Sequence, residues 1–289
     1  MINYIISLLG FSSINNTLFI KEHNLKNLSY EVGINQFIDR EYINEYYIET
    51  DNHSLIINED NNYNEYEYNN ELIPEEYDWR NKNKVSSVKN QGDCGSCWSF
   101  SATGAVESIW AIKNNILYNL SEQELVDCSF KNNGCNGGSM DYAFEYIINN
   151  GLCINNSYPY VGNQNTCNKD NCQSVISLSN YSDIESNDEK LLKRIVYYQP
   201  VSVAIQANKR SFQLYKKGIY SDLQCGTELD HGVLLVGYGY DNNYNMKYWI
   251  IKNSWGSEWG ENGYIRILRD IDDQRGLCGI AMQPSIPII

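Results

Sequence analysis

The stretch QGDCGSCWSF, residues 91–100, contains the pattern that decides the expected fold. Cys97 follows a Gly-Ser pair, and apolar residues then recur at helical spacing, which predicts a helix from Cys97 to about Asn114. Those apolar residues are Phe100, Val106, Ile109 and Trp110. The first turn of a helix has unpaired N–H groups and the positive end of the helix dipole, which favour a thiolate over a thiol. Cys97 is therefore a candidate nucleophile, although such a cysteine, taken alone, could also be an inert buried thiol.

A nucleophilic thiolate needs a proton partner. The chain holds three histidines: His23, His53 and His231. Only His231 lies in the part of the chain expected to fold compactly, 134 residues after Cys97 (231 − 97). Asn253 follows Cys97 by 156 residues (253 − 97). Taken singly, His231 is typical of a strand residue, Asn253 of a turn and Trp255 of a core. Only their combination with Cys97 indicates catalysis.

The folded part of the chain changes character along its length. A helix is predicted from Met140 to Ile148, and two S-x-x-E capping boxes, Ser121 with Glu124 and Ser186 with Glu189, predict two helix starts. Four β-rich stretches occur later: Val201–Ala207, His231–Gly239, Tyr248–Trp255 and Tyr264–Leu268. Helices first and an antiparallel sheet later form an α+β pattern. A cleft between two such halves is the expected place for a site.

Composition excludes several classes of protein. The 289 residues include 36 acidic and 22 basic side chains, and the net charge of −14 argues against a nucleic-acid or phosphate-binding surface. No apolar run reaches the ~18 residues of a membrane span, so no integral membrane span is expected. Nine cysteines indicate disulfides formed in an oxidising compartment, with one thiol left over. The chain has no nucleotide-binding or metal-binding motif, so we expect no cofactor and no metal.

Together these motifs resemble those of papain-family cysteine proteases of the cathepsin L-like branch. The resemblance covers residues 73–289, with the motifs in family order and at family spacing. The motifs are the cysteine stretch 91–100, GCNGG at 134–138, the His-Gly pair at 231–232, NSWG at 253–256 and CGIA at 278–281. The resemblance implies a papain-like α+β fold of two subdomains. Its N-terminal half would be helical and its C-terminal half an antiparallel β-barrel, with the active-site cleft between them.

The resemblance assigns a role to each motif residue. Cys97 would be the nucleophile and His231 its proton partner. Asn253 would orient the imidazole, and Trp255 would shield that hydrogen bond from water. Gln91 would donate its side-chain amide to the oxyanion. The implied protein is a thiol-dependent endopeptidase that works through a Cys97–His231 thiolate–imidazolium pair and an acyl-enzyme.

Two other functions are weighed against this one. An exopeptidase of the kind that blocks its cleft with a His-bearing loop is excluded, because the folded domain has a single histidine, His231. The alternative that stays open is a catalytically silent homologue that binds peptides or inhibitors in the same cleft. Labelling of Cys97 by an epoxide thiol inhibitor would distinguish it from an enzyme.

The resemblance also implies disulfides and a free thiol. Three bridges would leave Cys97 unpaired: Cys94–Cys135, Cys128–Cys167 and Cys225–Cys278. Cys153 and Cys172 lie outside this set. They form either a fourth bridge, Cys153–Cys172, or two unpaired thiols.

Counting along the aligned motifs gives the expected substrate-binding residues. They are Gly137, Gly138, Met140, Ala204, Leu229, Asp230, Gly232 and Gln283. The two consecutive glycines would let a substrate main chain approach closely. Met140 and Leu229 would make the pocket for the substrate residue two before the cut apolar and adaptable. Because Gln283 offers no charge to an arginine, we expect Leu, Val or Phe in that pocket.

The N-terminal part of the chain indicates a zymogen. The pattern Gly33-x-Asn35-x-Phe37-x-Asp39 matches a pro-region motif of cathepsin L-like zymogens. Residues 1–39 are therefore interpreted as a signal segment or an inhibitory pro-region, because the apolar start fits either a signal peptide or the remnant of a pro-region helix. Residues 40–72, rich in Asn, Tyr and Glu, predict a low-complexity acidic linker that is removed on activation. Residues 73–289 form the expected papain-like peptidase domain.

The same reasoning gives the expected partners and location. The partners are protein or peptide substrates, the chain's own pro-segment as an intramolecular inhibitor, and cystatin-like inhibitors. No nucleic-acid partner is expected, and the protein is expected to be a monomer. The cysteine count places it in the secretory pathway, in a lysosome-like or extracellular location.

Overall fold

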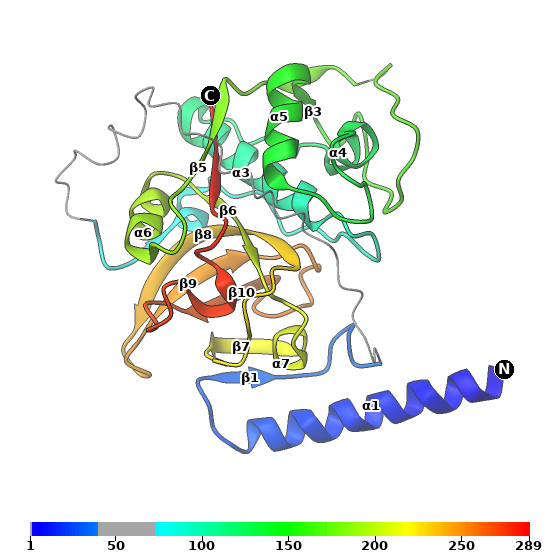
Figure 1. Cartoon of the computed structure of the whole chain (residues 1–289), viewed down its shortest axis with the longest axis vertical. Helices are drawn as coiled ribbons and strands as arrows, with labels where there is room; N and C mark the ends of the chain where they lie inside the picture. The colour runs from blue at the N-terminus through cyan, green and yellow to red at the C-terminus, as the bar shows by residue number, and fades with distance from the viewer. Residues whose placement is uncertain (1, 40–72, 171) are drawn as a thin grey trace.

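The computed structural model describes residues 2–39, 73–170 and 172–289, with the backbone alone for residues 2–11. One half of the molecule is built from three helices: α3 (Cys97–Asn114), α4 (Glu122–Cys128) and α5 (Met140–Asn150). Figure 1 shows these helices beside a second half that consists mainly of strands. This arrangement confirms the α+β prediction. The linker predicted at 40–72 lies outside the described residues.

Helix α3 joins the two halves. It is buried along most of its length and contacts both the other helices and the sheet. A Cβ atom at Gly104 would lie 2.9 Å from Cδ2 of Leu234 in strand β8 (His231–Asp241), so the helix packs closely on that strand. The hydroxyl of Ser101 also donates to the Val233 carbonyl oxygen at 2.7 Å. The N-terminus of α3 is therefore held at the seam between the halves.

The two shorter helices of the helical half both start at serine caps, of which the sequence predicted the one at Ser121. The hydroxyl of Ser121 accepts from the N–H of Glu124 at 2.9 Å and so caps α4, as predicted. Ser139 caps α5, and Gly151 ends it. Because both helices start at side-chain caps, the loops that lead into them have fixed directions.

Helix α6 (Glu189–Tyr198) corrects the second predicted capping box. Its cap is Asp188, whose carboxylate accepts from the N–H groups two and three residues further on, both at 2.9 Å. The predicted cap, Ser186, instead donates its hydroxyl to a main-chain carbonyl elsewhere in the chain. Glu189 accepts from Nε1 of Trp249 at 2.7 Å. Its carboxylate is thereby drawn into the core and does not close a capping box.

The second half contains a nine-stranded sheet. Besides β8, its strands are β1 (Tyr30–Val32), β2 (Tyr77–Asp78), β5 (Asn180–Asp183), β6 (Val201–Ile205), β7 (Tyr215–Tyr220), β9 (Met246–Lys252), β10 (Tyr264–Leu268) and β11 (Ser285–Ile288). They pair in the order β1-β7-β10-β9-β8-β6-β11-β5, with β2 on β8. All these pairs are antiparallel except β10 with β7. The remaining short elements are β3 (Leu152–Cys153) paired with β4 (Ser174–Ile176), η1 (Trp79–Lys82), α7 (Arg210–Gln213) and η2 (Leu277–Gly279).

The sheet differs from the antiparallel barrel that the resemblance implied. Within the described residues no strand pairing joins β1 to β5, so the hydrogen-bonded path stays open. The outer edge of β7 is occupied by β1, which comes from the N-terminal segment of the chain. One interior pair is parallel as well, which a purely antiparallel barrel would not contain.

Strand β8 separates two hydrophobic cores, because successive side chains of a strand point to opposite faces. Val233 and Leu235 belong to the core of the strand-rich half. Leu234 and Val236 belong to the core of the helical half. The start of β8, where His231 lies, is therefore at the same seam as the N-terminus of α3.

The N-terminal segment packs on the strand-rich half. Helix α1 (Ile2–Asn24) is followed by β1, and Figure 1 shows β1 between this helix and β7. The side chain of Asn24 makes hydrogen bonds to both the N–H and the carbonyl oxygen of Val32, at 3.0 and 2.9 Å. Among the described helices, none combines the length and the apolar character that crossing a membrane requires.

The structure contains four disulfides: Cys94–Cys135, Cys128–Cys167, Cys153–Cys172 and Cys225–Cys278. Cys97 is the free cysteine among the described residues. Cys153 and Cys172, for which two states were open, thus form a bridge.

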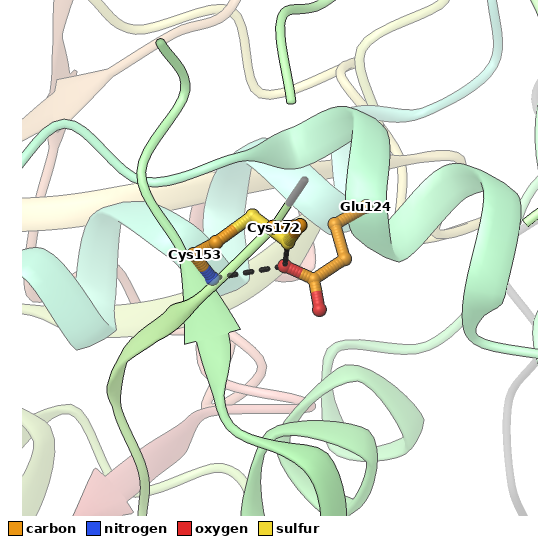
Figure 2. Close-up of side chains that lie close together, drawn as sticks. All are labelled: Glu124, Cys153 and Cys172. Carbon is orange, nitrogen blue, oxygen red and sulfur yellow. Dashed lines mark hydrogen bonds between the residues drawn. A yellow bond between two sulfur atoms is a disulfide. The ribbon is translucent and has the colours of Figure 1, made fainter. Parts of the chain in front are cut away.

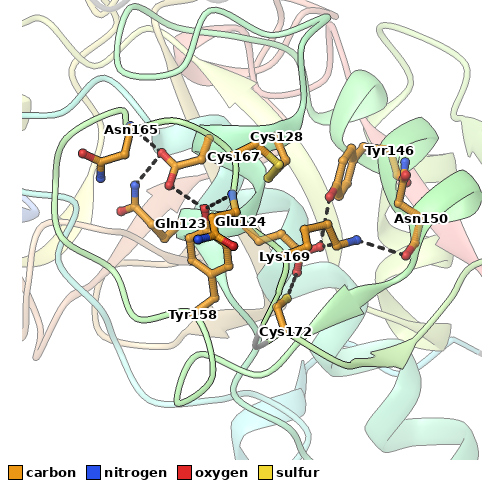
Figure 3. Close-up of a disulfide and its surroundings, with 12 residues drawn as sticks. Gln123, Glu124, Cys128, Tyr146, Asn150, Tyr158, Asn165, Cys167, Lys169 and Cys172 are labelled. Atoms are coloured by element: carbon orange, nitrogen blue, oxygen red, sulfur yellow. Dashed lines mark hydrogen bonds and ion pairs between the residues drawn. A yellow bond between two sulfur atoms is a disulfide. The ribbon is translucent and has the colours of Figure 1, made fainter.

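Glu124 lies against this fourth bridge, as Figure 2 shows. Its carboxylate accepts from the N–H of Cys153 at 2.9 Å and lies 3.2 Å from the sulfur of Cys172. Figure 3 shows the other side of the same carboxylate, where Lys169 pairs with it at 2.9 Å and Tyr146 donates to it at 3.0 Å. The two sulfurs are bonded to each other and the carboxylate is paired. The cluster therefore fastens the loop 154–172 to α4.

Candidate active site

Cys97 is the first residue of α3 and is fully buried. The loop that leads to it is held by the Cys94–Cys135 disulfide. The backbone N–H groups of Gly232 and Trp98 lie close enough to its sulfur to favour the thiolate. The thiol therefore lies against the residue that directly follows His231.

Gly232 permits this close approach. A Cβ atom there would lie 3.3 Å from the backbone nitrogen of Trp98, at the start of α3, and 3.2 Å from the sulfur of Met140. Both distances are shorter than ordinary contacts, so a larger residue would require the helix that positions Cys97, or Met140, to shift by a few tenths of an ångström. The requirement for glycine thus comes from the meeting of helix and strand.

His231 is buried and has two oriented contacts. Its Nε2 lies 2.7 Å from Oδ1 of Asn253, and its ring stacks on Trp255 with centroids 4.7 Å apart. The same Asn253 oxygen accepts from the N–H of Ser254 at 2.7 Å, which fixes the amide with its oxygen towards the imidazole. Nε2 therefore donates, and Nδ1, which has no hydrogen-bond partner among the described residues, keeps its lone pair. Nδ1 is the nitrogen available to the thiol.

Gln91 is fully buried beside the same loop. Its Nε2 donates to the carbonyl oxygen of Cys94 at 2.9 Å, and its Oε1 accepts from the hydroxyl of Ser254 at 2.6 Å. Its own N–H donates to the carbonyl oxygen of Ser254 at 2.8 Å. These contacts hold the side-chain amide rigidly, with its second N–H left to donate.

Burial sets the charge state of the closed site. It raises the pKa of the Cys97 thiol to about 11, although the N–H groups of Gly232 and Trp98 act in the opposite direction. It lowers the pKa of His231 to about 4, although the hydrogen bond to Asn253 raises it. The enclosed site therefore favours a neutral thiol and a neutral imidazole. This differs from the thiolate expected at a helix terminus, because desolvation outweighs the N–H groups.

A buried charge cluster, which no sequence motif indicated, lies beneath the site. Lys89 pairs with Glu107 at 2.8 Å and with Glu122 at 2.5 Å, and both carboxylates are buried. Lys252, the residue before Asn253, is also buried and donates to the hydroxyl of Ser86 at 2.8 Å, which in turn donates to Glu107. Burial lowers the pKa of Lys252 to about 8. The cluster links α3 and α4 to the end of β9, directly before Asn253.

Three of the expected substrate-binding residues come together. Ala204 in β6 is paired with Gly232 in β8, and the sulfur of Met140 lies beside that glycine. Leu229 packs against the helical core. Gln283 is half-buried between η2 and β11.

Asp230 and the two loop glycines have structural contacts of their own. The carboxylate of Asp230 accepts from the N–H of Ala207 at 2.6 Å, which ties the chain before β8 to the end of β6. Gly137 and Gly138 lie in the loop before α5, where a Cβ atom at Gly138 would be 2.3 Å from Oδ1 of Asn132. Glycine is thus required at Gly138 by the protein's own packing.

The N-terminal motif reaches the site directly. Phe37 is buried, and its ring meets that of Trp255 edge-on with centroids 4.8 Å apart. The side-chain amide of Gln36 donates to the carbonyl oxygen of Trp255 at 2.8 Å. The side-chain amide of Asn35 donates to the carbonyl oxygen of Gln213 at 2.7 Å. The segment therefore contacts the tryptophan that stacks on His231.

Known proteins have sequences similar to that of this chain. Residues 73–288 match the family model described as papain family cysteine protease. The chain is 47% identical over 279 residues to the probable cysteine protease RD21B of Arabidopsis thaliana, and the match covers 94% of this chain and 59% of that protein. It is 46% identical over 284 residues to the KDEL-tailed cysteine endopeptidase CEP2 of the same plant, covering 94% and 78%. The chain thus spans less than two thirds of the length of the first of these relatives.

A solved structure also resembles the whole chain, including its N-terminal segment. It is the Amb a 11 cysteine protease, a major ragweed pollen allergen, in its proform. The two structures superpose with a TM-score of 0.88 at 39% sequence identity, over 98% of this chain and 87% of that one.

Proposed function

The chain belongs to the papain family of cysteine proteases, and from this premise we propose that it is a thiol-dependent endopeptidase synthesised as a zymogen. One observation carries the proposal. The free thiol of Cys97 lies at a helix N-terminus, against the residue that follows His231, and His231 is oriented by Asn253. A binding protein would need neither the free thiol nor the oriented imidazole. The catalytically silent alternative has no comparable support.

The first step moves a proton from Cys97 to Nδ1 of His231. The Nε2–H of His231 is held by Asn253, so Nδ1 is the basic nitrogen. The product is an ion pair that is neutral overall, so it costs less than ionising either group alone. Removal of the N-terminal segment would admit water and lower that cost further. Trp255 keeps the bond between His231 and Asn253 dry.

The thiolate then attacks the carbonyl carbon of the peptide bond. The carbonyl electron pair moves to oxygen, where Gln91 and the backbone N–H of Cys97 donate to it. His231 passes its Nδ1 proton to the leaving amine as the C–N bond breaks, which leaves a thioester on Cys97. A water molecule gives a proton to His231 and its hydroxide to the thioester carbon. The sulfur leaves as a thiolate, and the acid product departs.

The N-terminal segment acts as an intramolecular inhibitor. Its contacts with Trp255 support this role, and so does the likeness to a solved proform. Cleavage near Leu72 would release residues 1–72 and leave a peptidase domain at 73–289. The Arg40 to Leu72 stretch is the linker that is cut.

Specificity follows from the wall formed by Met140, Ala204 and Gly232. These residues are apolar or small, so Leu, Val or Phe is preferred two residues before the cut, with discrimination among the three of only ~1–3 kcal/mol. Leu229, Asp230 and Gln283 complete the assigned set. Gly137 and Gly138 would pair with the substrate main chain. The single histidine of the domain leaves no His-bearing loop, which favours endopeptidase action.

Four disulfides support a location in the secretory pathway, either lysosome-like or extracellular. Cystatin-like inhibitors fit the same cleft, and the protein acts as a monomer.

The proposed endopeptidase function is tested by mass spectrometry of the activated chain after treatment with an epoxide thiol inhibitor. One adduct on Cys97, absent from Cys97→Ala, is expected. A fully reduced and accessible Cys97 that takes no label would support the silent alternative.

A further inference from the structure

Tyr160 contacts two residues of the segment 91–97, which carries both donors of the proposed oxyanion hole and is called the oxyanion segment below. Its hydroxyl donates to the carbonyl oxygen of Gln91 at 2.8 Å. The same hydroxyl lies 2.7 Å from the hydroxyl of Ser96, the cap residue of α3. No sequence motif assigned to the site contains this tyrosine.

The directions of these bonds can be worked out. A phenol has one proton, and the carbonyl oxygen of Gln91 can only accept, so that proton goes to Gln91. The contact with Ser96 must then run the other way, with the serine hydroxyl donating to the tyrosine oxygen. Tyr160 thus connects the main chain of Gln91 to the residue directly before Cys97.

These two attachment points carry the two donors of the proposed oxyanion hole. Gln91 supplies its side-chain amide, and the backbone N–H of Cys97 lies one residue after Ser96. An oxyanion donor is effective only when its position is fixed before charge develops, because any reorganisation adds to the barrier. Tyr160 is itself held in place, since its ring packs edge-on against Phe100 of α3 at 4.9 Å.

We propose that Tyr160 is a positioning residue for the oxyanion hole, which it preorganises through Gln91 and Ser96 without touching the substrate. The inference rests on the proposed endopeptidase function and adds to it a residue that acts only as negative charge forms on the carbonyl oxygen. Substrate binding and the nucleophilicity of Cys97 should not depend on the Tyr160 hydroxyl.

The test compares Tyr160→Phe with the wild type after removal of the N-terminal segment. For a peptide substrate we expect kcat to fall about tenfold, less than the ~10²-fold or more for loss of a direct donor, with KM nearly unchanged. Alkylation of Cys97 by iodoacetamide displaces iodide and forms no oxyanion. The rate of this alkylation should therefore be the same in Tyr160→Phe as in the wild type. An inactive wild type would remove the proposed function and this inference together.

Two results would overturn the inference while leaving the function intact. One is an unchanged kcat in Tyr160→Phe. The other is an equal loss in hydrolysis and alkylation, which would indicate general damage to the site. Tyr158→Phe is the matched control, because the Tyr158 hydroxyl bonds to Asp127 at 2.9 Å, in the helical half, and not to the oxyanion segment. It should keep wild-type kcat.

A double-mutant cycle separates action through Gln91 from an independent effect. In a Gln91→Ala background, Tyr160→Phe should cost less than it does in the wild type, because one of the donors it positions is already gone. Fully multiplicative losses would contradict the proposal. If Tyr160→Phe fails to fold, Ser96→Ala removes the hydrogen bond between Ser96 and Tyr160 from the other side. This variant should also hydrolyse peptides more slowly while its Cys97 is alkylated at the wild-type rate. Equal rates of both reactions in Ser96→Ala and the wild type would overturn the inference.

Discussion

The ring of Phe37 meets the ring of Trp255 edge-on at 4.8 Å, and this contact joins the N-terminal segment to the catalytic centre. Trp255 also stacks on His231, with ring centroids 4.7 Å apart. A single tryptophan therefore contacts both the N-terminal segment and His231. When Phe37 docks weakly, the candidate active site should therefore be more exposed to substrate.

The first prediction concerns that contact. Phe37→Ala should weaken inhibition by the N-terminal segment by 10²-fold or more, since loss of a buried phenylalanine costs about 3–5 kcal/mol. The measurement is the inhibition constant of the separate segment on the activated domain. Ile34→Ala is the control, because Ile34 belongs to the same motif but is 74% exposed. Equal inhibition by the Phe37→Ala and wild-type segments would contradict the account.

The second prediction concerns pH and rests on His23, which is buried between Phe19 and Tyr30. Burial lowers its pKa below 6.5, the nearby charge of Lys26 acts in the same direction, and Tyr30 and Asp222 oppose it. The released segment therefore binds more protons than the docked one. Docking is strongest above pH 6.5 and weakens as the pH falls through that value towards the lower pKa of the docked state.

His23→Gln should accordingly flatten the pH dependence of inhibition by the segment between pH 7 and about 5. Thr17→Ala provides the control, because Thr17 is an exposed, uncharged residue of α1 and its replacement should leave the slope unchanged. A His23→Gln segment with the full wild-type slope would rule out His23 as the responsive group.

The third prediction concerns the fourth bridge. Replacing both Cys153 and Cys172 with serine removes a bridge between residues that are 19 positions apart in sequence. In the chain-entropy model this lowers the free energy of unfolding by roughly 3 kcal/mol, or about 6–12 °C in Tm for a domain of this size. Differential scanning calorimetry of the activated domain measures the change. An unaltered Tm would show that the contacts of Glu124 hold the loop without the bridge.

The fourth prediction concerns specificity. Gln283→Glu should raise kcat/KM for a substrate with Arg two residues before the cut, because it supplies a charge for the guanidinium. A panel of fluorogenic dipeptides compares Arg with Leu, Val and Phe. Gln283→Ala serves as the control and should give no gain for Arg. A wild type that already prefers Arg over Leu would show that the pocket is assigned wrongly.

The sequence was most informative where one residue or a short motif determines the structure. The helix from Cys97 to Asn114 and the cap at Ser121 were predicted because their signals are local. The cap at Ser186 was wrong because Asp188 competes for the same N–H groups and Trp249, 60 residues away in sequence, withdraws Glu189.

Contacts between distant segments could not be predicted in this way. Lys89, Glu107 and Glu122 come from three separate segments, and nothing in their local sequence marks them as partners. The same holds for the hydroxyl of Tyr160, which lies 69 residues from Gln91 in sequence. The pairing of β1 with β7 likewise joins segments almost 190 residues apart in sequence. Only the folded chain brings such groups together.

The fifth prediction addresses the central claim, that Cys97 and His231 together hydrolyse peptide bonds. It is tested by kcat for a fluorogenic peptide with Leu two residues before the cut, measured after removal of the N-terminal segment. Cys97→Ala and His231→Ala should lose activity by factors approaching ~10⁶, whereas Asn253→Ala, which only orients the imidazole, should lose less. Wild-type turnover in Cys97→Ala would contradict the account.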